Sequence, residues 1–245
     1  MSWFKTGEEG KQAAKNDEED RQKSTGAYRL WIPPGGSTQF TFLDTEGFFF
    51  KEHNFLHQGS WQNWETCIQD IGAEDCPFCE AGLSYYYECV FTIIDHAEYY
   101  SKKHEKQMRD VKKLLVLRST ARKKMLRKKE SLEGNLTYCR FETHRDDKKE
   151  CSTGEDFDYL SRASMEEVMA LAPAEWAGKP MAPSDWIKPF DYPKLFQPRS
   201  ADSLRRILGR IGKGGSASTP PVGSGETAGL PSSDDSAKPS VQSLL

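Results

Sequence analysis

Residues 51–82 read KEHNFLHQGSWQNWETCIQDIGAEDCPFCEAG, and this stretch indicates that part of the chain folds around a metal ion. Cys67 is followed, after eight residues, by the motif CPFC at 76–79. Two thiolates in such a tight turn can bind one tetrahedral zinc ion, with zinc–sulfur distances of about 2.3 Å. Cys67 is close enough in sequence to fold back as the third ligand. The spacing therefore predicts a zinc site.

The fourth ligand is open on spacing alone, with His53, His57 and Cys89 as candidates. Other roles for these cysteines compete with structural zinc. A thioredoxin-like redox pair normally lies in a βαβ unit, which this sequence does not indicate. Buried cysteines rarely cluster by chance with this spacing. The remaining cysteines, Cys139 and Cys151, have no partners in sequence and are interpreted as plain thiols.

A catalytic zinc is a further alternative. It would normally have a nearby carboxylate that acts as a base. Glu65, Glu74 and Glu80 are candidates for that base, but no H-x-E motif of the deaminase type precedes the cysteines. No Walker loop, GxGxxG, HExxH or GxSxG motif occurs either. We therefore expect one structural Zn²⁺ and no enzymatic activity.

Composition excludes two broad classes. The chain has 245 residues, and its longest apolar runs, such as 114–117, are far shorter than the roughly 20 residues that cross a bilayer. The N-terminus lacks the apolar core of a signal peptide. Six cysteines are too few for a disulfide scaffold. We expect neither a membrane protein nor a secreted one.

Charge is distributed unevenly along the chain. Between residues 102 and 129, thirteen Lys or Arg side chains face only Glu105 and Asp110, which gives this window a charge of +11. The whole chain carries −3, so the remainder carries −14. A local basic stripe attracts polyanions whatever the overall charge is. The alternative interpretation is an ordinary solvated helical face.

The body of the chain reads as mainly β with added helices. Strands are expected around 28–32, 38–43, 85–95, 112–119 and 135–145, and helices at 118–134, 165–173 and 201–212. Several short strands with one intervening helix fit a small barrel followed by C-terminal additions. Residues 1–26 are expected to form a flexible N-terminal segment. Residues 212–245 hold eight Ser, six Gly and four Pro and are expected to be a disordered tail.

The segment from His53 through Trp61 to the CPFC turn resembles the zinc subdomain of tailed-phage single-stranded DNA-binding proteins, the helix-destabilising replication proteins. In that family a histidine, a W-x-E-T-C-like segment and C-P-x-C hold one structural zinc beside an OB-fold. YRLWIPPGGSTQFTFLD resembles the opening strands, and VFTIIDHAEYYSKKHEK with VKKLLVL resembles the strands after the zinc segment. The likeness covers about 27–160. The tail, with only Asp234 and Asp235 near its end, is less acidic than the family pattern.

The resemblance implies an OB-fold over 27–160 with a zinc-binding insertion at about 48–84. The two helices predicted after this region indicate a helical C-terminal extension over 161–211. The implied zinc ligands are His53, Cys67, Cys76 and Cys79. His53 is preferred to His57 because thirteen residues separate it from Cys67, close to the family spacing, and because it follows the strand-like FFFKE.

Binding a single strand requires cations for phosphates and aromatic faces for bases. The expected DNA contacts combine both kinds of side chain: Trp61, Tyr99, Tyr100, Lys102, Lys103, Lys106, Arg109, Lys112, Lys113, Arg122 and Lys123. The aromatic runs 48–50 and 85–87 are interpreted instead as core packing.

The expected function is to coat and protect single-stranded DNA during viral replication, recombination and repair, in the cytoplasm of an infected bacterium. The tail would contact replication or recombination proteins. The alternatives are a zinc-containing nuclease or recombination enzyme that acts on DNA, and a zinc-ribbon module that docks on a polymerase or transcription complex.

Overall fold

The computed structural model describes residues 7–8, 27–57, 60–71, 75–101, 105–148, 150–176 and 178–211. The predictions of a flexible N-terminal segment at 1–26 and of a disordered tail at 212–245 therefore fall almost wholly outside the described residues. Among the helices in the described ranges, none combines the length and the apolar content that crossing a membrane requires.

The fold is mixed α+β and mainly β, as the sequence predicts. The strands are β1 (Tyr28–Arg29), β2 (Gly36–Phe42), β3 (Phe48–His57), β4 (Ser60–Thr66), β5 (Tyr85–Asp95), β6 (Tyr99–Ser101), β7 (Lys106–Met108), β8 (Val111–Arg118), β9 (Cys139–Arg145), β10 (Asp156–Arg162), β11 (Glu175–Trp176) and β12 (Lys179–Pro180). The helices are η1 (Gln69–Ile71), α2 (Pro77–Glu80), α3 (Ser119–Ser131), α4 (Met165–Met169), α5 (Pro183–Trp186), α6 (Tyr192–Leu195) and α7 (Ala201–Ile211).

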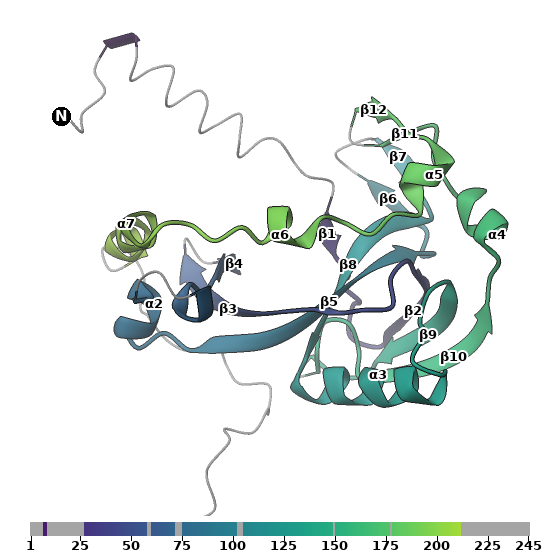
Figure 1. Ribbon diagram of the computed structural model, residues 1–245, viewed down its shortest axis with the longest axis horizontal. Helices are drawn as coiled ribbons and strands as arrows, with labels where there is room; N and C mark the ends of the chain where they lie inside the picture. The colour runs from purple at the N-terminus through teal and green to yellow at the C-terminus, as the bar shows by residue number, and fades with distance from the viewer. Residues whose placement is uncertain are drawn as a thin grey trace, which may run out of the picture.

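Strand β5 organises the molecule. Its sequence, YYYECVFTIID, is rich in aromatic and β-branched residues, which favour a strand. It pairs with β8 from Glu88 to Asp95, while β3 pairs with its first half and β2 with its last three residues. Residues 48–88, which hold β3, β4, η1, α2 and the start of β5, extend beyond the core, and we call them the arm (Figure 1).

The core lies between the sheet and α3. Strands β2, β5, β8 and β9 supply most of its fully buried side chains, among them Phe42, Phe91, Leu115 and Phe141. Helix α3 joins this cluster through Met125, one of the few apolar anchors of its basic sequence. The helix expected at 118–134 is therefore confirmed, and it connects β8 to β9.

The sheet is not closed by strand pairing. Its order is β1-β8-β5-β2-β9-β10, and β8 and β10 are not paired with each other. The chain after β1 passes near this opening. On one side the Leu30 amide donates to the Leu114 carbonyl (2.8 Å), and on the other the Ile32 amide donates to the Ser152 carbonyl (2.8 Å). These two bonds link β8 to the β9–β10 loop through residues 30–32.

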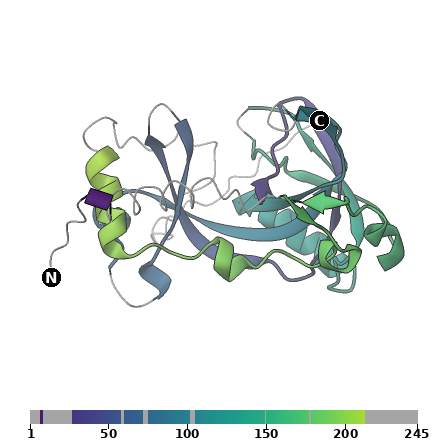
Figure 2. The ribbon, with the colours of Figure 1, turned by 90° about the horizontal axis from the view of Figure 1, so that it is seen from above.

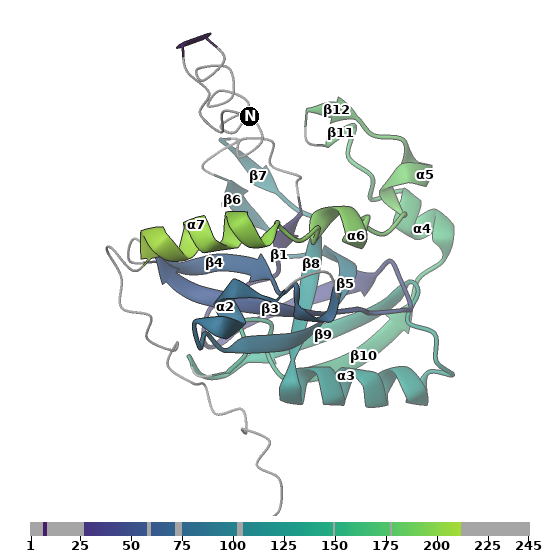
Figure 3. The ribbon, with the colours of Figure 1, turned by 60° about the vertical axis from the view of Figure 1, so that its left-hand side comes forward.

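The C-terminal extension holds the two helices predicted from the sequence, as α4 and α7, and the short helices α5 and α6 lie between them. Residues 186–200, which we call the strap, run along the outer face of β8, β5 and β3 towards the arm (Figures 1 and 3). Trp186 is fully buried beside Ile94, and the Phe196 ring lies 4.3 Å from that of Phe50. Seen from above, α7 lies at the arm end of the molecule and the core lies at the other end (Figure 2).

Candidate metal centre and nucleic-acid interface

The structure brings four of the predicted residues into one cluster. One ligand atom from each of His53, Cys67, Cys76 and Cys79 lies within 4.8 Å of all the others. His53 is on β3, Cys67 directly follows β4, and the other two cysteines belong to the α2 turn. Cys89 is buried in the core cluster instead. The histidine chosen from the sequence is thus the one that completes this cluster.

The separations within the cluster fit one tetrahedral ion. His53 Nε2 is 3.4 Å from Cys76 Sγ and 3.5 Å from Cys79 Sγ, and the Cys67 and Cys79 sulfurs are 3.6 Å apart. Zinc bonds of about 2.3 Å to sulfur and about 2.0 Å to nitrogen give tetrahedral edges of roughly 3.8 Å between sulfurs and 3.5 Å between sulfur and nitrogen. Three thiolates and one imidazole would fill all four positions.

The CPFC sequence forms the turn for local reasons. Pro77 occupies the first turn of α2, where its missing N–H costs no hydrogen bond. Gly82 ends the turn with φ +75°, a conformation that favours glycine, and its amide donates to the Cys79 carbonyl (2.9 Å). Phe78, between the two cysteines, is fully buried. These features fix the direction of both thiols.

His53 is held in the form that a metal requires. Its Nδ1 is 3.1 Å from the backbone oxygen of Ser84, which fits donation from Nδ1–H and leaves Nε2 facing the sulfurs. Burial lowers the pKa of His53, which favours the neutral ring. The His53 ring also packs against the rings of Phe78 and Tyr85, with distances between ring centroids of 5.3 Å and 6.2 Å.

Beside this cluster, exposed rings on one face of the arm lie next to two partly exposed cations, one from the arm and one from α3. Lys51 and Tyr87 are opposite each other in the β3–β5 register, so their side chains point to the same side of the sheet. Phe49 and Tyr85 lie two residues away from them along β3 and β5, so alternation places their side chains on this side too. Lys51 Nζ lies 4.7 Å from the Tyr85 ring centroid, and the Arg122 guanidinium lies 5.1 Å from that of Tyr87. Phe49, Tyr85 and Tyr87 are 42%, 45% and 47% exposed. We call these five residues the arm patch.

Sequence reasoning missed four members of the arm patch. It assigned the runs 48–50 and 85–87, which hold the three rings, to the core, and Lys51 lies outside the basic stripe at 102–129. Half of that assignment holds: Phe48 and Phe50 pack under the strap. The signal that could have found the patch is strand alternation, which places Tyr85 and Tyr87 on the face opposite Tyr86. A strand with rings on both faces cannot bury all of them against one core.

The opposite face of the arm carries a buried ionic network. Arg29 donates to Glu52 (2.5 Å) and lies 3.4 Å from Glu88, while Arg118 donates to the other Glu88 oxygen (2.5 Å). The carboxylates are 3% and 0% exposed. Burial and the neighbouring Glu88 charge raise the pKa of Glu52 to about 8. This network joins β1, β3, β5 and β8, and so fixes the arm to the core.

The structure places Tyr99, Tyr100 and Lys113 at the other end of β5 from the arm patch. Tyr99 is half-buried with Lys113 Nζ 4.7 Å from its ring centroid, and the same ammonium pairs with Asp95 (2.6 Å). Tyr100 is 56% exposed. These residues do not meet the cations of the arm patch.

Lys112 is buried rather than displayed. It is 6% exposed, and its ammonium donates to the backbone oxygens of Trp186 (3.1 Å) and Lys188. Burial lowers its pKa to about 8. The side chain therefore fastens the strap to β8 and is not presented to a ligand.

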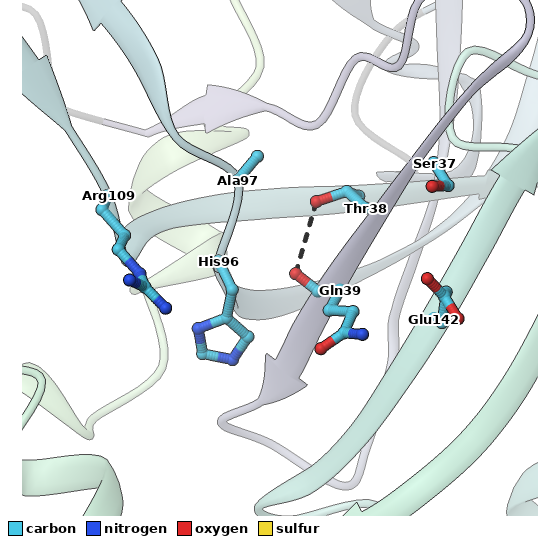
Figure 4. A pocket seen from close by; sticks show the side chains of 7 residues that line it. All are labelled: Ser37, Thr38, Gln39, His96, Ala97, Arg109 and Glu142. Carbon is cyan, nitrogen blue, oxygen red and sulfur yellow. Dashed lines mark hydrogen bonds between the residues drawn. The ribbon is translucent and has the colours of Figure 1, made fainter.

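Arg109 lines a polar pocket of about 280 Å³ between β2, β9 and the residues that follow β5 (Figure 4). The lining residues are Ser37, Thr38, Gln39, His96, Ala97, Arg109 and Glu142. Both His96 nitrogens are engaged, by Asp110 (2.6 Å) and by the hydroxyl of Thr41 (2.7 Å). Because Thr41 is only 1% exposed, this histidine does not activate an accessible nucleophile.

Of the other predicted contacts, Arg122 belongs to the arm patch and Lys123 is exposed at the next position of α3. Lys102 and Lys103 lie outside the described residues, as do the side chains of Trp61 and Lys106.

Comparison with known proteins gives no family assignment. No model of a known protein family matches the sequence, and no curated protein matches it either. The function is therefore argued from the geometry above.

Proposed function

We propose that this protein binds single-stranded DNA through the arm patch and carries one structural zinc ion, as do the phage replication proteins that its sequence resembles. The observation that carries the proposal is three exposed rings on one face of the arm, accompanied by Lys51 of the arm and Arg122 of α3. Stacking contributes about 1–3 kcal/mol per base and tolerates any base, while cations bind phosphates. The protein would coat strands exposed during replication, recombination and repair inside an infected bacterium.

We further propose that the core is an OB-fold with the arm inserted. Strands β2, β5, β8, β9 and β10 would be its five strands, and α3 lies between the third and fourth of them. The pairings β2–β5, β5–β8, β2–β9 and β9–β10 agree with that arrangement. Residues 30–32 would bridge β8 and the β9–β10 loop, where the strands themselves are unpaired.

The strap supports placing DNA on the arm patch. OB-folds usually bind oligonucleotides on the face of their second and third strands, here β5 and β8. Much of the outer face of these strands is covered, because Val90, Leu114 and Val116 pack against Tyr192, Leu195 and Phe196. The arm patch lies on the opposite face of β5, where the rings remain exposed.

Zinc would act by positioning the arm. Bound to the four protein ligands, it would supply structural rigidity and have no free position for a reacting water. Tyr85 contacts His53 edge-on, so the cluster also orients a ring of the arm patch. The alternative of a zinc-dependent nuclease needs an open coordination position and finds no support in this ligand set.

The test is a titration of labelled oligothymidylate and of a duplex, followed by fluorescence anisotropy. Tyr85→Ala/Tyr87→Ala should weaken single-strand binding about 30-fold or more, from two lost stacking contacts. Tyr159→Ala, an exposed tyrosine on β10, is the matched control and should bind as the unmodified protein does. Equal affinity for single strand and duplex, or an unaffected double variant, would overturn the proposal. Intact DNA after incubation with Mg²⁺ would separately exclude the nuclease.

A further inference from the structure

Helix α7 has two chemically different faces. Its apolar face, with Leu204 and Ile211 at 0% and 2% exposure, packs in the cluster that contains Phe78 of the α2 turn. Its other face displays Arg205, Arg206 and Arg210, all exposed. The helix is thus anchored beside the cluster of His53 and the three cysteines, and its arginines face the solvent.

The three arginines differ in their partners. Arg205 pairs with Asp202 of its own helix (2.9 Å). Within the described ranges, no acidic group lies within ion-pair distance of Arg206 or Arg210. These two positions are one helical turn apart, so they form a single stripe about 5–6 Å long.

The position of α7 connects this stripe to the arm patch. Tyr85 contacts His53, His53 contacts Phe78, and Phe78 packs with Leu204 of α7. Figures 1 and 3 both show α7 beside α2 at the end of the arm. A nucleic-acid strand that leaves Tyr85 past the α2 turn would therefore reach α7 next.

We propose that Arg206 and Arg210 bind phosphates of the same DNA strand, so that α7 extends the binding surface beyond the arm patch. This inference rests on the proposed function. The partner is identified by charge and by place: an unpaired cationic stripe at the end of a row of exposed rings fits a polyanion that continues past those rings. The DNA contacts expected from the sequence did not include the arginines of this helix, since the basic stripe at 102–129 dominates the charge pattern.

The experiment compares Arg206→Gln/Arg210→Gln with the control Lys179→Gln/Lys188→Gln, which removes the same charge from exposed positions at the core end of the molecule, away from α7. Glutamine keeps helix propensity, and zinc content with melting temperature verifies the fold. Affinity is measured against salt with oligonucleotides of about 4 and about 16 nucleotides, the usual range of site sizes for one OB-fold.

With the long oligonucleotide, the arginine variant should make the negative slope of log K against log salt shallower by about 1.4, or about 0.7 for each lost phosphate contact. With the short one, both variants should match the unmodified protein. An unchanged slope with long DNA would refute the role of α7, while the Tyr85→Ala/Tyr87→Ala result would still decide the proposed function. Tighter binding by the arginine variant would also refute it, because an acidic segment of the chain would then be the occupant.

Discussion

Asp44 shows how one buried carboxyl is stabilised under the strap. The Thr92 amide and the Tyr192 hydroxyl both donate to its Oδ2, whereas its Oδ1 has no partner among the described residues. Burial outweighs these bonds and raises the pKa of Asp44 from 3.8 to about 6. Because the folded state holds the proton more tightly than the unfolded chain, this carboxyl contributes stability below about pH 4 and loses it as the pH rises to about 6.

Asp44→Asn should therefore flatten the fall in stability between pH 4 and pH 6. The neutral amide still accepts from Tyr192 and avoids the cost of a buried charge, so the difference at pH 7 should favour the variant by about 1–3 kcal/mol. Urea unfolding at several pH values measures it, with Asp158→Asn on the exposed face of β10 as control. An identical pH profile for Asp44→Asn and the unmodified protein would show that this carboxyl is not the titrating group.

At the scale of elements, β3, α2 and α7 meet at the cluster of His53 and the three cysteines. Phe55, Phe78 and Leu204 come from these three elements and are buried together, within van der Waals reach of the ligand cysteines. In a small site of this kind the free energy of metal binding is also folding free energy. Losing the ion should therefore release α7 as well as the turn that binds it.

Zinc should co-purify at one ion per chain, and His53→Ala should lower that content sharply. His57→Ala should leave it near one, because His53 already completes the cluster. Chelation should speed hydrogen exchange in residues 53–83 and 201–211 while β9 and α3 keep their protection, as mass spectrometry can measure. Full zinc content in His53→Ala would move the fourth ligand elsewhere.

The elements also show what a single sequence can and cannot predict. Cysteine spacing is local and predicts the three cysteines of the cluster, whereas the choice of His53 depends on the family resemblance, because spacing alone leaves the fourth ligand open. The composition of β5, β8 and α3 predicts those elements. Lys112 was misjudged because only the strap, more than 70 residues later, buries it. The arm patch was missed because the sequence does not say which face of β3 and β5 the strap covers. Long-range packing decides both points.

At the scale of the whole molecule, the strap links three apolar clusters. Trp186 belongs to the cluster at one end of the core, Phe190 and Phe196 to that on the outer sheet face, and α7 to that at the arm. The extension from 186 to 211 is thus part of the folded body. Residues 212–245 contain few large apolar side chains that could add to it.

Two truncations separate these parts. Ending the chain after Ile211 should change the melting temperature by no more than about 2 °C and leave DNA affinity near that of the full chain. Ending it after Pro189 uncovers Phe48 and Phe50 and should lower the melting temperature by about 8 °C or more, from the loss of several kcal/mol of apolar burial. Calorimetry measures both. A large loss in the first truncation would place the end of the folded body beyond Ile211.

The continuity of β5 has a mechanical consequence. Its first residues carry Tyr85 and Tyr87, and its remainder is bonded to β8 through eight register pairs, from Glu88 with Arg118 to Asp95 with Val111. A taut DNA strand that pulls on those rings along the axis of β5 would load the ladder in shear, so that many hydrogen bonds would have to yield together. A pull across the axis would open the ladder one bond at a time. Resistance to force should therefore depend on the direction in which the bound strand leaves the arm.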